Sequence, residues 1–378
     1  MLDASVPAEP VNSCARRYKG LHATLPRRGL NHAAETRMPL LQNLITDLAG
    51  IRVGHAQDPR VATGVTAIVF DTANVASAVA QGGGPGGRDT ALLEPEMTVA
   101  GVDAVLLSGG SVFGLDAAGG AIALLRQQGR GFSVGSVNVP IAVQATTFDL
   151  LNGGDKDWGR MPPYWELGWL ATQSASSDPF ALGTAGGGYG ATTATFKGGV
   201  GSASAVTPSG FAVGAIVVVN AVGSTLIGEG PHFWAGPYEV GAEFGGLGTP
   251  AHVPPEALRL RMKGGPPPST TIALVVTDAV LTKAQVKRLA IMADDGLARA
   301  IRPAHAPMDG DTVFAVATLQ KPMREAMHDL TDIGLAAADC LARAVARGVY
   351  EATALPFPGA LPAWKDRFAA LVPKSPAS

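Results

Sequence analysis

The sequence predicts a layered α+β fold. Short apolar runs rich in β-branched residues, typical of buried strands, occur at 65–70, 104–107, 211–220, 272–277 and 312–319. Helical apolar spacing occurs at 111–128, 282–301 and 327–345. A doubly wound parallel sheet needs a regular alternation of strand and helix, which this order lacks. We therefore expect layers of sheet covered by helices.

The composition is that of a globular protein with little surface charge. The chain has 378 residues, of which 47% are apolar and 16% charged, so it can bury a large core. The net charge of −2 offers no electrostatic argument for a nucleic-acid partner. No apolar run approaches the roughly 20 residues that span a bilayer, so no membrane partner is expected. The low charge favours a homo-oligomer that hides part of its surface.

The cysteine content indicates the compartment. Cys14 and Cys340 are too few for a disulfide framework or a zinc site of their own. A reducing cytoplasm is the simplest location for such a chain. The many glycines, 48 in number, indicate close backbone approaches and tight turns.

Both ends of the chain differ from its middle. Residues 1–37 are basic, lack a periodic apolar pattern, and lack the continuous apolar core of a secretory signal. We expect a disordered arm there, or leader sequence ahead of a natural start at Met38. One catalytic domain is expected over 38–355. The proline-rich segment 356–378 is expected to be a loose surface tail.

Each remaining element has its own local signal. Residues 111–128 form a glycine-containing helical pattern whose small residues favour close packing on a sheet, and 132–143 is predicted to be extended. Residues 152–190, rich in Gly, Pro, Trp and Tyr, are expected to form a long shaped loop with a short helix. Thr282 with Gln285 forms a capping box for the helix over 282–301. The last helix is expected to stop near Gly348.

The stretch 266–281 organises the rest of the chain. Three prolines precede Ser269, Thr270 and Thr271, and a buried strand follows from Ile272. Proline disfavours helix in the residue before it, so this approach is expected to be extended and exposed. A hydroxyl at the start of a buried strand, after a breakable connector, suits a chain that cuts itself to expose an N-terminal nucleophile. Taken by themselves, these residues favour an ordinary proline-rich loop followed by a strand, and it is the rest of the chain that changes this weighting.

Residues near other strand ends complete a possible hydrolase site. They are Lys197, Asn220, Asp309 and Asp311. A freed threonine α-amine has an ordinary pKa of about 8 and can act as base for its own hydroxyl. A nearby lysine would lower that pKa, and Asn220 can donate to a developing oxyanion. Asp309 and Asp311 can orient the lysine or the amine, or accept a substrate amine. Taken singly, each residue is also explained by a turn or a strand end.

Competing motifs are weaker. The pattern GxGxxG at Gly82, Gly84 and Gly87 lacks the long helix of a dinucleotide site, since Pro95 breaks the following segment. No G-x-S-x-G elbow is present. His55 and His305 have no metal-ligand spacing and are interpreted as structural.

Seven segments together resemble a known family: LITDLAGIRVGHA, LLSGGSVFGLDAAGG, GDKDWGRMPPY, GYGATTATFKGGVGSAS, VVVNAVG, STTIALVVTDAVLTKAQ and MDGDTVFA. In this order, over residues 42–350, they resemble the self-processing aminopeptidases of the D-aminopeptidase and β-aminopeptidase type. Within that family the resemblance is closest to nylon-oligomer hydrolases, which cut 6-aminohexanoate oligomers. It implies a four-layer αββα fold of the N-terminal-nucleophile type, and tetramers or similar oligomers of cut protomers.

The resemblance also implies roles for individual residues. Cleavage would fall between Ser269 and Thr270, giving a large subunit that ends at Ser269 and a small subunit over 270–378. Thr270 would be the nucleophile, with Lys197, Asn220, Asp309 and Asp311 as partners. Tyr164 in the PPY segment is a candidate for lining the substrate site. No metal or organic cofactor is implied.

This sequence departs from the nylon-hydrolase pattern at Ser269, where asparagine is expected. Self-cleavage needs only a carbonyl at that position, so it is expected to persist, while its rate and a cut before Ser269 stay open. The leading hypothesis is an amidohydrolase that cuts 6-aminohexanoate oligomers or short peptides through an acyl-enzyme. The alternatives are an aminopeptidase for D- or β-amino-acid peptides, an acyltransferase, and an uncut binding protein on the same fold.

Overall fold

A long strand, β2 (Thr63–Ala80), links two β-sheets. Its first half pairs antiparallel with β1 (Ile51–Asp58) and β4 (Val102–Ser108), and its second half pairs with β11 (Thr312–Lys321). Residues 71–73 between the two halves are exposed, and the register with β4 shifts there. The short strand predicted over 65–70 is therefore only the first half of a strand that both sheets share.

The computed structural model describes residues 42–264 and 269–373, so the prediction for residues 1–37 lies outside the described residues. In the first sheet, β4 also pairs parallel with β7 (Ala142–Thr146), which in turn pairs with the short β3 (Gly87–Arg88). In the second sheet, β11 pairs parallel with β10 (Thr270–Ala279). Antiparallel strands β9 (Ala212–Asn220) and β8 (Gly199–Val206) follow in that order.

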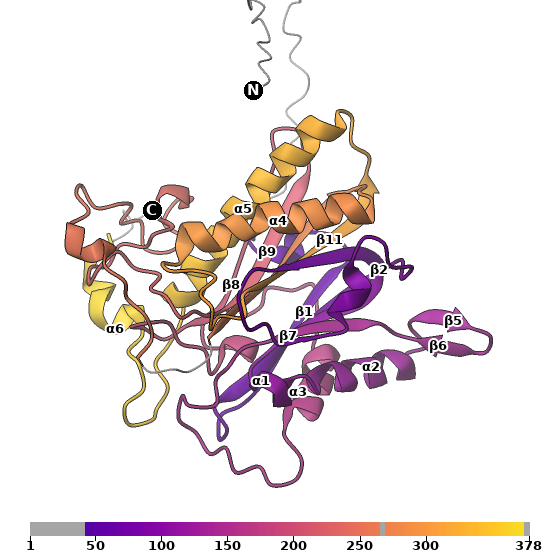
Figure 1. The fold of residues 1–378 in the computed structure, drawn as a ribbon, viewed down its shortest axis with the longest axis horizontal. Helices are drawn as coiled ribbons and strands as arrows, with labels where there is room; N and C mark the ends of the chain where they lie inside the picture. The colour runs from indigo at the N-terminus through magenta and orange to yellow at the C-terminus, as the bar shows by residue number, and fades with distance from the viewer. Residues whose placement is uncertain (1–41, 265–268, 374–378) are drawn as a thin grey trace, which may run out of the picture. The chain divides into compact units, whose positions relative to one another are not determined.

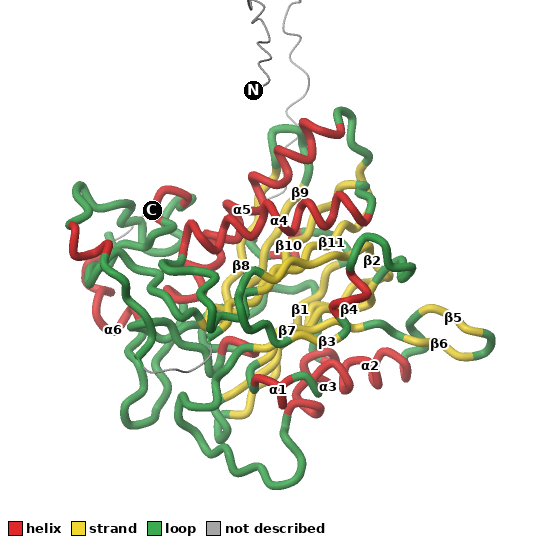
Figure 2. The backbone as a smooth tube through the Cα atoms, viewed as in Figure 1, coloured by secondary structure: helices red, strands yellow, loops and turns green. Residues whose placement is uncertain are grey.

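Helices cover the outer face of each sheet (Figure 1). The first sheet packs against α2 (Ala117–Gln127) and α3 (Tyr164–Gln173). The second packs against α4 (Lys283–Ala300) and α5 (Ala326–Tyr350). Figure 2 shows the strands lying between these two groups of helices. The predicted four-layer αββα arrangement is confirmed.

Side-chain alternation along β10 explains why the layers hold together. Ile272, Leu274 and Val276 belong to the core between the two sheets. Ala273 and Val275 belong to the core under α4 and α5. Because successive side chains of a strand point to opposite faces, a strand covered on both faces must be apolar throughout. The continuous apolar run after Thr271 is thus the signature of a central strand.

The boundaries of several elements differ from the predictions. The helix expected over 111–128 is divided into α1 (Ser111–Gly114) and α2, and the extended segment after it begins as a hairpin of β5 (Phe132–Val134) and β6 (Val137–Val139). The small residues of α2 were expected to allow close packing on the sheet. The closest approach at a glycine of α2 is instead to α3, because a Cβ on Gly120 would lie 2.0 Å from the Trp165 carbonyl oxygen. The final helix continues two residues beyond Gly348. The capping box at Thr282 is confirmed.

Residues 357–373 do not form a loose tail. They carry α6 (Trp364–Phe368), and the Trp364 side chain is fully buried. The indole stacks on Phe233 with ring centroids 5.8 Å apart, and its Nε1 donates to the Pro231 carbonyl. A buried tryptophan contributes a large apolar area, so the expectation based on proline content is wrong.

Short 3-10 turns complete the fold, at Ile45–Asp47, Thr90–Leu93, Gly186–Gly188, Gly236–Tyr238, Pro255–Leu258 and Ala369–Leu371. Within the described part of the chain, no helix combines the length and the apolar character needed to cross a membrane.

Candidate active site

The Ser269–Thr270 bond lies at the N-terminal end of β10, a strand inside the second sheet. Thr270 is the first residue of this central strand and pairs with Asn220, the last residue of β9. Both hydroxyl residues are buried, Ser269 at 0% and Thr270 at 4% exposure. The three prolines before Ser269, residues 266–268, lie outside the described residues, so the extended and exposed approach stays a prediction.

Two donors meet at the Ser269 carbonyl oxygen. Thr270 Oγ1 donates to it over 2.6 Å, and the Gly310 backbone N–H donates to it over 2.9 Å. A Cβ at position 310 would lie 2.7 Å from Thr270 Oγ1, so this contact requires glycine. The arrangement places a hydroxyl beside the preceding carbonyl and a backbone donor on the oxygen that would become negative if the hydroxyl attacked.

The carboxylates on either side of Gly310 hold this turn in place. Asp311 accepts from the Thr271 N–H over 2.8 Å and from the His305 N–H over 2.9 Å. Asp309 Oδ2 accepts from the Ala306 N–H over 3.2 Å. Both carboxylates are only 1% exposed. Burial, and then the charge of Asp311, raises the pKa of Asp309 to about 7.

His305 connects this turn to α4. Its Nε2 lies 3.2 Å from Asp294 and its Nδ1 lies 3.0 Å from Asp311. Hydrogen bonding to Asp294 and then to Asp311 raises the pKa of His305 to about 10. The imidazolium therefore joins two carboxylates, which agrees with the structural interpretation made from the sequence.

The glycine run at 82–84 packs against the same turn. The N–H of Gly84 donates to the Asp309 carbonyl over 2.7 Å. A Cβ on Gly82 would lie 2.4 Å from the Asp311 nitrogen. Glycines 82–84, which belong to the formal GxGxxG match, thus allow the backbone to approach the Asp309–Asp311 turn closely, as the glycine content indicated.

Asn220 faces Thr270 across the strand pair, yet its side chain is directed to other partners. Its Oδ1 accepts from the Thr192 N–H over 3.0 Å and from Lys263 Nζ over 3.2 Å. Its Nδ2 donates to the Phe148 carbonyl over 3.0 Å. In this uncut chain the Ser269 oxygen receives its backbone hydrogen bond from Gly310 rather than from Asn220.

Lys197, two residues before the start of β8, is fully buried. Its Nζ donates to the carbonyls of Gly188 over 2.9 Å and Gly198 over 2.8 Å. Burial lowers the pKa of Lys197 to about 7. The hydrogen bonds of the ammonium go to backbone oxygens and not to Asp309 or Asp311, the partners considered from the sequence.

A second lysine, which the sequence reasoning missed, lies among these groups. Lys263 donates its backbone N–H to the Val222 carbonyl over 2.8 Å, and its Nζ contacts Asn220. Lys263 is half-buried, and burial lowers its pKa to about 7, against the opposing charge of Asp309. Its position seven residues before Thr270 was the only available signal.

Tyr164 begins α3 and lies in a second buried polar cluster. Its hydroxyl has no hydrogen-bond partner among the described residues. Nearby Asp149 accepts from Thr63 Oγ1 over 2.6 Å and from the Gly110 N–H over 2.8 Å. Burial and then the charge of Asp149 raise the pKa of Tyr164. Asp149 follows Phe148, whose carbonyl Asn220 contacts, so this cluster adjoins the first through the backbone.

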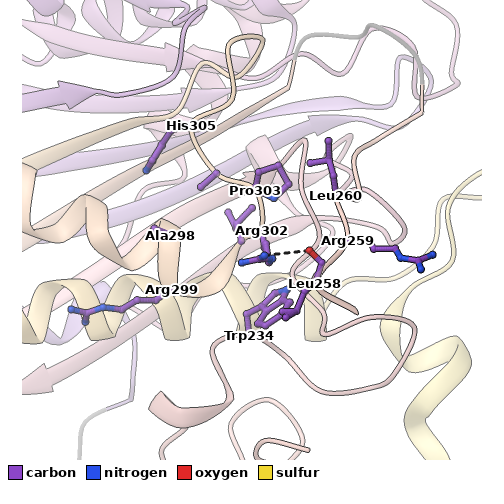
Figure 3. A pocket seen from close by; sticks show the side chains of 11 residues that line it. Trp234, Leu258, Arg259, Leu260, Ala298, Arg299, Arg302, Pro303 and His305 are labelled. Carbon is purple, nitrogen blue, oxygen red and sulfur yellow. Dashed lines mark hydrogen bonds between the residues drawn. The ribbon is translucent and has the colours of Figure 1, made fainter. Parts of the chain in front are cut away.

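A cavity of about 500 Å³ borders the site at His305 (Figure 3). Trp234, Leu258 and Arg302 lie on its other side. Arg302 lies over the Trp234 ring, 5.7 Å from its centroid, and donates to the Leu258 carbonyl over 3.3 Å. The candidate catalytic residues are not among those that line it. His305 connects the cavity to them through Asp311.

Comparison with known proteins identifies the family. The family model "Peptidase family S58" matches residues 43–360. The chain belongs to peptidase family S58. An uncharacterized aminopeptidase of Mycobacterium tuberculosis is 41% identical over 347 residues, which cover 86% of this chain and 98% of the relative. An uncharacterized aminopeptidase of Mycobacterium leprae is 41% identical over 331 residues, covering 80% and 89%.

Solved structures agree with the S58 assignment at the level of the fold. A Burkholderia sp. beta-aminopeptidase has a TM-score of 0.62 at 24% identity, with 88% of this chain and 95% of that chain covered. The L-aminopeptidase D-Ala-esterase/amidase of Ochrobactrum anthropi, described as a variant of the Ntn-hydrolase fold, has a TM-score of 0.62 at 20% identity, covering 87% and 93%.

These comparisons confirm the family expected from the seven segments. The S58 chain is an amide-bond hydrolase of the aminopeptidase type with an Ntn-hydrolase fold. The particular closeness to nylon-oligomer hydrolases stays a prediction, as do the roles of the individual site residues.

Proposed function

We propose that this S58 aminopeptidase cuts its own Ser269–Thr270 bond and then uses the freed Thr270 as its nucleophile. The observation that carries the proposal is the Ser269 carbonyl oxygen, which accepts from both Thr270 Oγ1 and the Gly310 N–H. A positioned nucleophile and a fixed donor on the same carbonyl are the two requirements for an acyl shift.

Self-cleavage is an acyl shift from nitrogen to oxygen, followed by hydrolysis of the ester. Thr270 Oγ1 bonds to the Ser269 carbonyl carbon, and the resulting oxyanion is stabilised by the Gly310 N–H. The carbon–nitrogen bond then breaks, and the Thr270 nitrogen takes the hydroxyl proton and becomes a primary amine. Water hydrolyses the remaining ester, which releases the Ser269 carboxylate and returns a proton to Oγ1.

Hydrolysis of a substrate repeats this chemistry with the new amine as base. The α-amine accepts the Oγ1 proton as the hydroxyl attacks the substrate carbonyl, and the departing amine takes that proton. Water then cleaves the acyl-enzyme. Asp311 holds the start of β10 through the Thr271 N–H, which keeps the nucleophile in register with Gly310.

The substrates we propose are short linear amides with a free amino group. The aminopeptidase names of the relatives and the buried carboxylate of Asp309 both favour a substrate that carries an amine. Within this class, 6-aminohexanoate oligomers and peptides of D- or β-amino acids are the candidates. We also assign Lys197 and Tyr164 to the site, as buried groups near the nucleophile. The cut protomers are proposed to assemble into a cytoplasmic oligomer, such as a tetramer.

Intact mass and N-terminal sequencing of fresh and aged protein test this proposal. We expect a fragment comprising residues 270–378, and an uncut chain for Thr270→Ala. A fragment that begins at Ser269 or Thr271 would show that this residue, and not Thr270, is the nucleophile. A wild-type chain that stays whole while it hydrolyses amides would refute the mechanism.

A further inference from the structure

The side chain of Lys263 reaches into the group of residues around the nucleophile. Its backbone pairs with the Val222 carbonyl over 2.8 Å, just beyond the end of β9. Its Nζ then donates to Asn220 Oδ1 over 3.2 Å, and Asn220 is the strand partner of Thr270. A primary ammonium on an unbranched four-carbon chain therefore lies beside the predicted site in the uncut protein.

The surrounding groups are suited to receive an ammonium. Asp309 is 1% exposed, and its Oδ1 has no hydrogen-bond partner among residues 42–264 and 269–373. A buried carboxylate oxygen without a partner is costly unless a cation lies nearby. Asp309 forms an isolated β-bridge with Ser269, the neighbour of Thr270, which pairs with Asn220. The charge of Lys263 acts to lower the pKa of Asp309, and the charge of Asp309 acts to raise the pKa of Lys263. An ammonium has three donors, and among the described residues the Nζ of Lys263 donates to Asn220 alone.

We propose that Asn220 Oδ1 and Asp309 form a subsite for the primary ammonium group of the substrate, and that Lys263 occupies this subsite in the uncut chain. The ligand class is an amide that carries its amine on an unbranched alkyl chain, because that is the shape of the present occupant. The uncut protein is thus blocked by its own side chain.

Cleavage would release this occupant, a step that rests on the proposed function. Lys263 lies six residues before the new chain end at Ser269. The neighbouring side chains hold the segment weakly, since Leu260 is 71% and Met262 41% exposed. Arg261 pairs with Glu229, whose side chain is 83% exposed, and such surface pairs contribute little. Once one end is free, the segment can leave the subsite.

The subsite itself can be tested without cleavage, in the uncut Thr270→Ala protein. The probe is 5-aminopentanamide, and pentanamide is the matched probe without the ammonium. We expect Lys263→Ala in this background to bind 5-aminopentanamide at least tenfold more tightly, with no change for pentanamide. Ligand-observed NMR titration measures both affinities at neutral pH.

Further variants distinguish the effect of the Lys263 charge on probe binding from the effect of its side-chain volume. Lys263→Met keeps most of the alkyl volume without the charge, so it should gain less than Lys263→Ala. Adding Asp309→Asn should remove the gain. Arg261→Ala, in the same segment, should bind both probes as the parent does. Equal tightening for both amides, or no tightening in a folded Lys263→Ala protein, would overturn the proposal.

The cut wild-type enzyme tests the release step. It should bind pentylamine, which has no amide bond to cut, as tightly as the uncut Lys263→Ala variant does. If the chain never cuts, the proposed function fails while the titrations above still decide whether the subsite exists. If the chain cuts and the affinity stays that of the blocked parent, the release of Lys263 is refuted.

Discussion

Thr270 Oγ1 donates a hydrogen bond of 2.6 Å to the carbonyl oxygen of Ser269, the residue before it. The same oxygen accepts from the Gly310 N–H. Gly310 belongs to a turn whose flanking carboxylates bind backbone N–H groups at Thr271, His305 and Ala306. The geometry of the bond proposed to break is therefore determined by a segment 40 residues further along the chain.

Gly310→Ala should slow self-cleavage at least tenfold. The added Cβ would lie 2.7 Å from Thr270 Oγ1 and 2.7 Å from the Gly84 carbonyl oxygen, so the hydroxyl must move from its carbonyl. A misplaced nucleophile loses rate steeply with small displacements. A time course on denaturing gels after rapid purification measures the rate.

The control for this variant is Gly230→Ala, whose Cβ would meet only the Ile227 carbonyl oxygen at 3.6 Å. It should cleave as the wild type does. Cleavage of a folded Gly310→Ala protein at the wild-type rate would show that the close contact at position 310 does not position the nucleophile.

Asn220→Ala should reduce the rate of self-cleavage by less than tenfold. In the uncut chain the Asn220 amide donates to the Phe148 carbonyl, and Gly310 supplies the backbone donor on the Ser269 oxygen. Loss of a genuine oxyanion donor costs about 100- to 1,000-fold. Self-cleavage of Asn220→Ala, followed by intact mass, distinguishes the two cases, and a loss in the larger range would return the oxyanion role to Asn220.

His305 should stabilise the folded chain at neutral pH and lose this effect in alkali. Its pKa is raised to about 10 from an ordinary 6.5, so the folded state binds the proton more tightly than the unfolded state does. The contribution is complete below about pH 6.5 and is lost as the pH rises through 10. We expect the free energy of unfolding of the wild type to exceed that of His305→Gln by about 1–2 kcal/mol near pH 6, and by less at pH 10.

Urea unfolding of both proteins at pH 6, 8 and 10 measures this difference. The comparison must be between variant and wild type, because the lowered pKa values of Lys197 and Lys263 have the opposite effect on stability over this range. A difference that is constant with pH would show that the imidazolium is not stabilised by Asp294 and Asp311.

Trp364→Ala should destabilise the fold by about 3–5 kcal/mol, the usual cost of truncating a buried tryptophan. The side chain is fully buried and stacks on Phe233. The same segment supplies the Pro362 carbonyl that accepts the Lys197 N–H, so the change should also loosen the segment that carries Lys197. Leu371→Ala, at a side chain that is 54% exposed, is the control and should unfold near the wild-type midpoint.

Much of the fold was accessible from local pattern. The apolar run after Thr271, the capping box at Thr282 and the helical spacing of α4 and α5 are properties of neighbouring residues, and the structure confirms them. Predictions failed where distant residues decide the outcome. Trp364 became part of the core through Phe233 and Tyr350, and proline content near it carried no sign of this.

The sequence by itself determined the family, the layered fold and the position of a buried hydroxyl at the start of a central strand, because these follow from motifs and from periodicity along one segment. Only the tertiary structure decided which groups surround that hydroxyl. The Gly310 donor, the Lys263 amine and the Asp309 oxygen, which has no hydrogen-bond partner within the described part of the chain, come together because separate turns meet where β9 and β10 pair and β11 begins. Such contacts depend on how the chain closes upon itself, which local spacing does not encode.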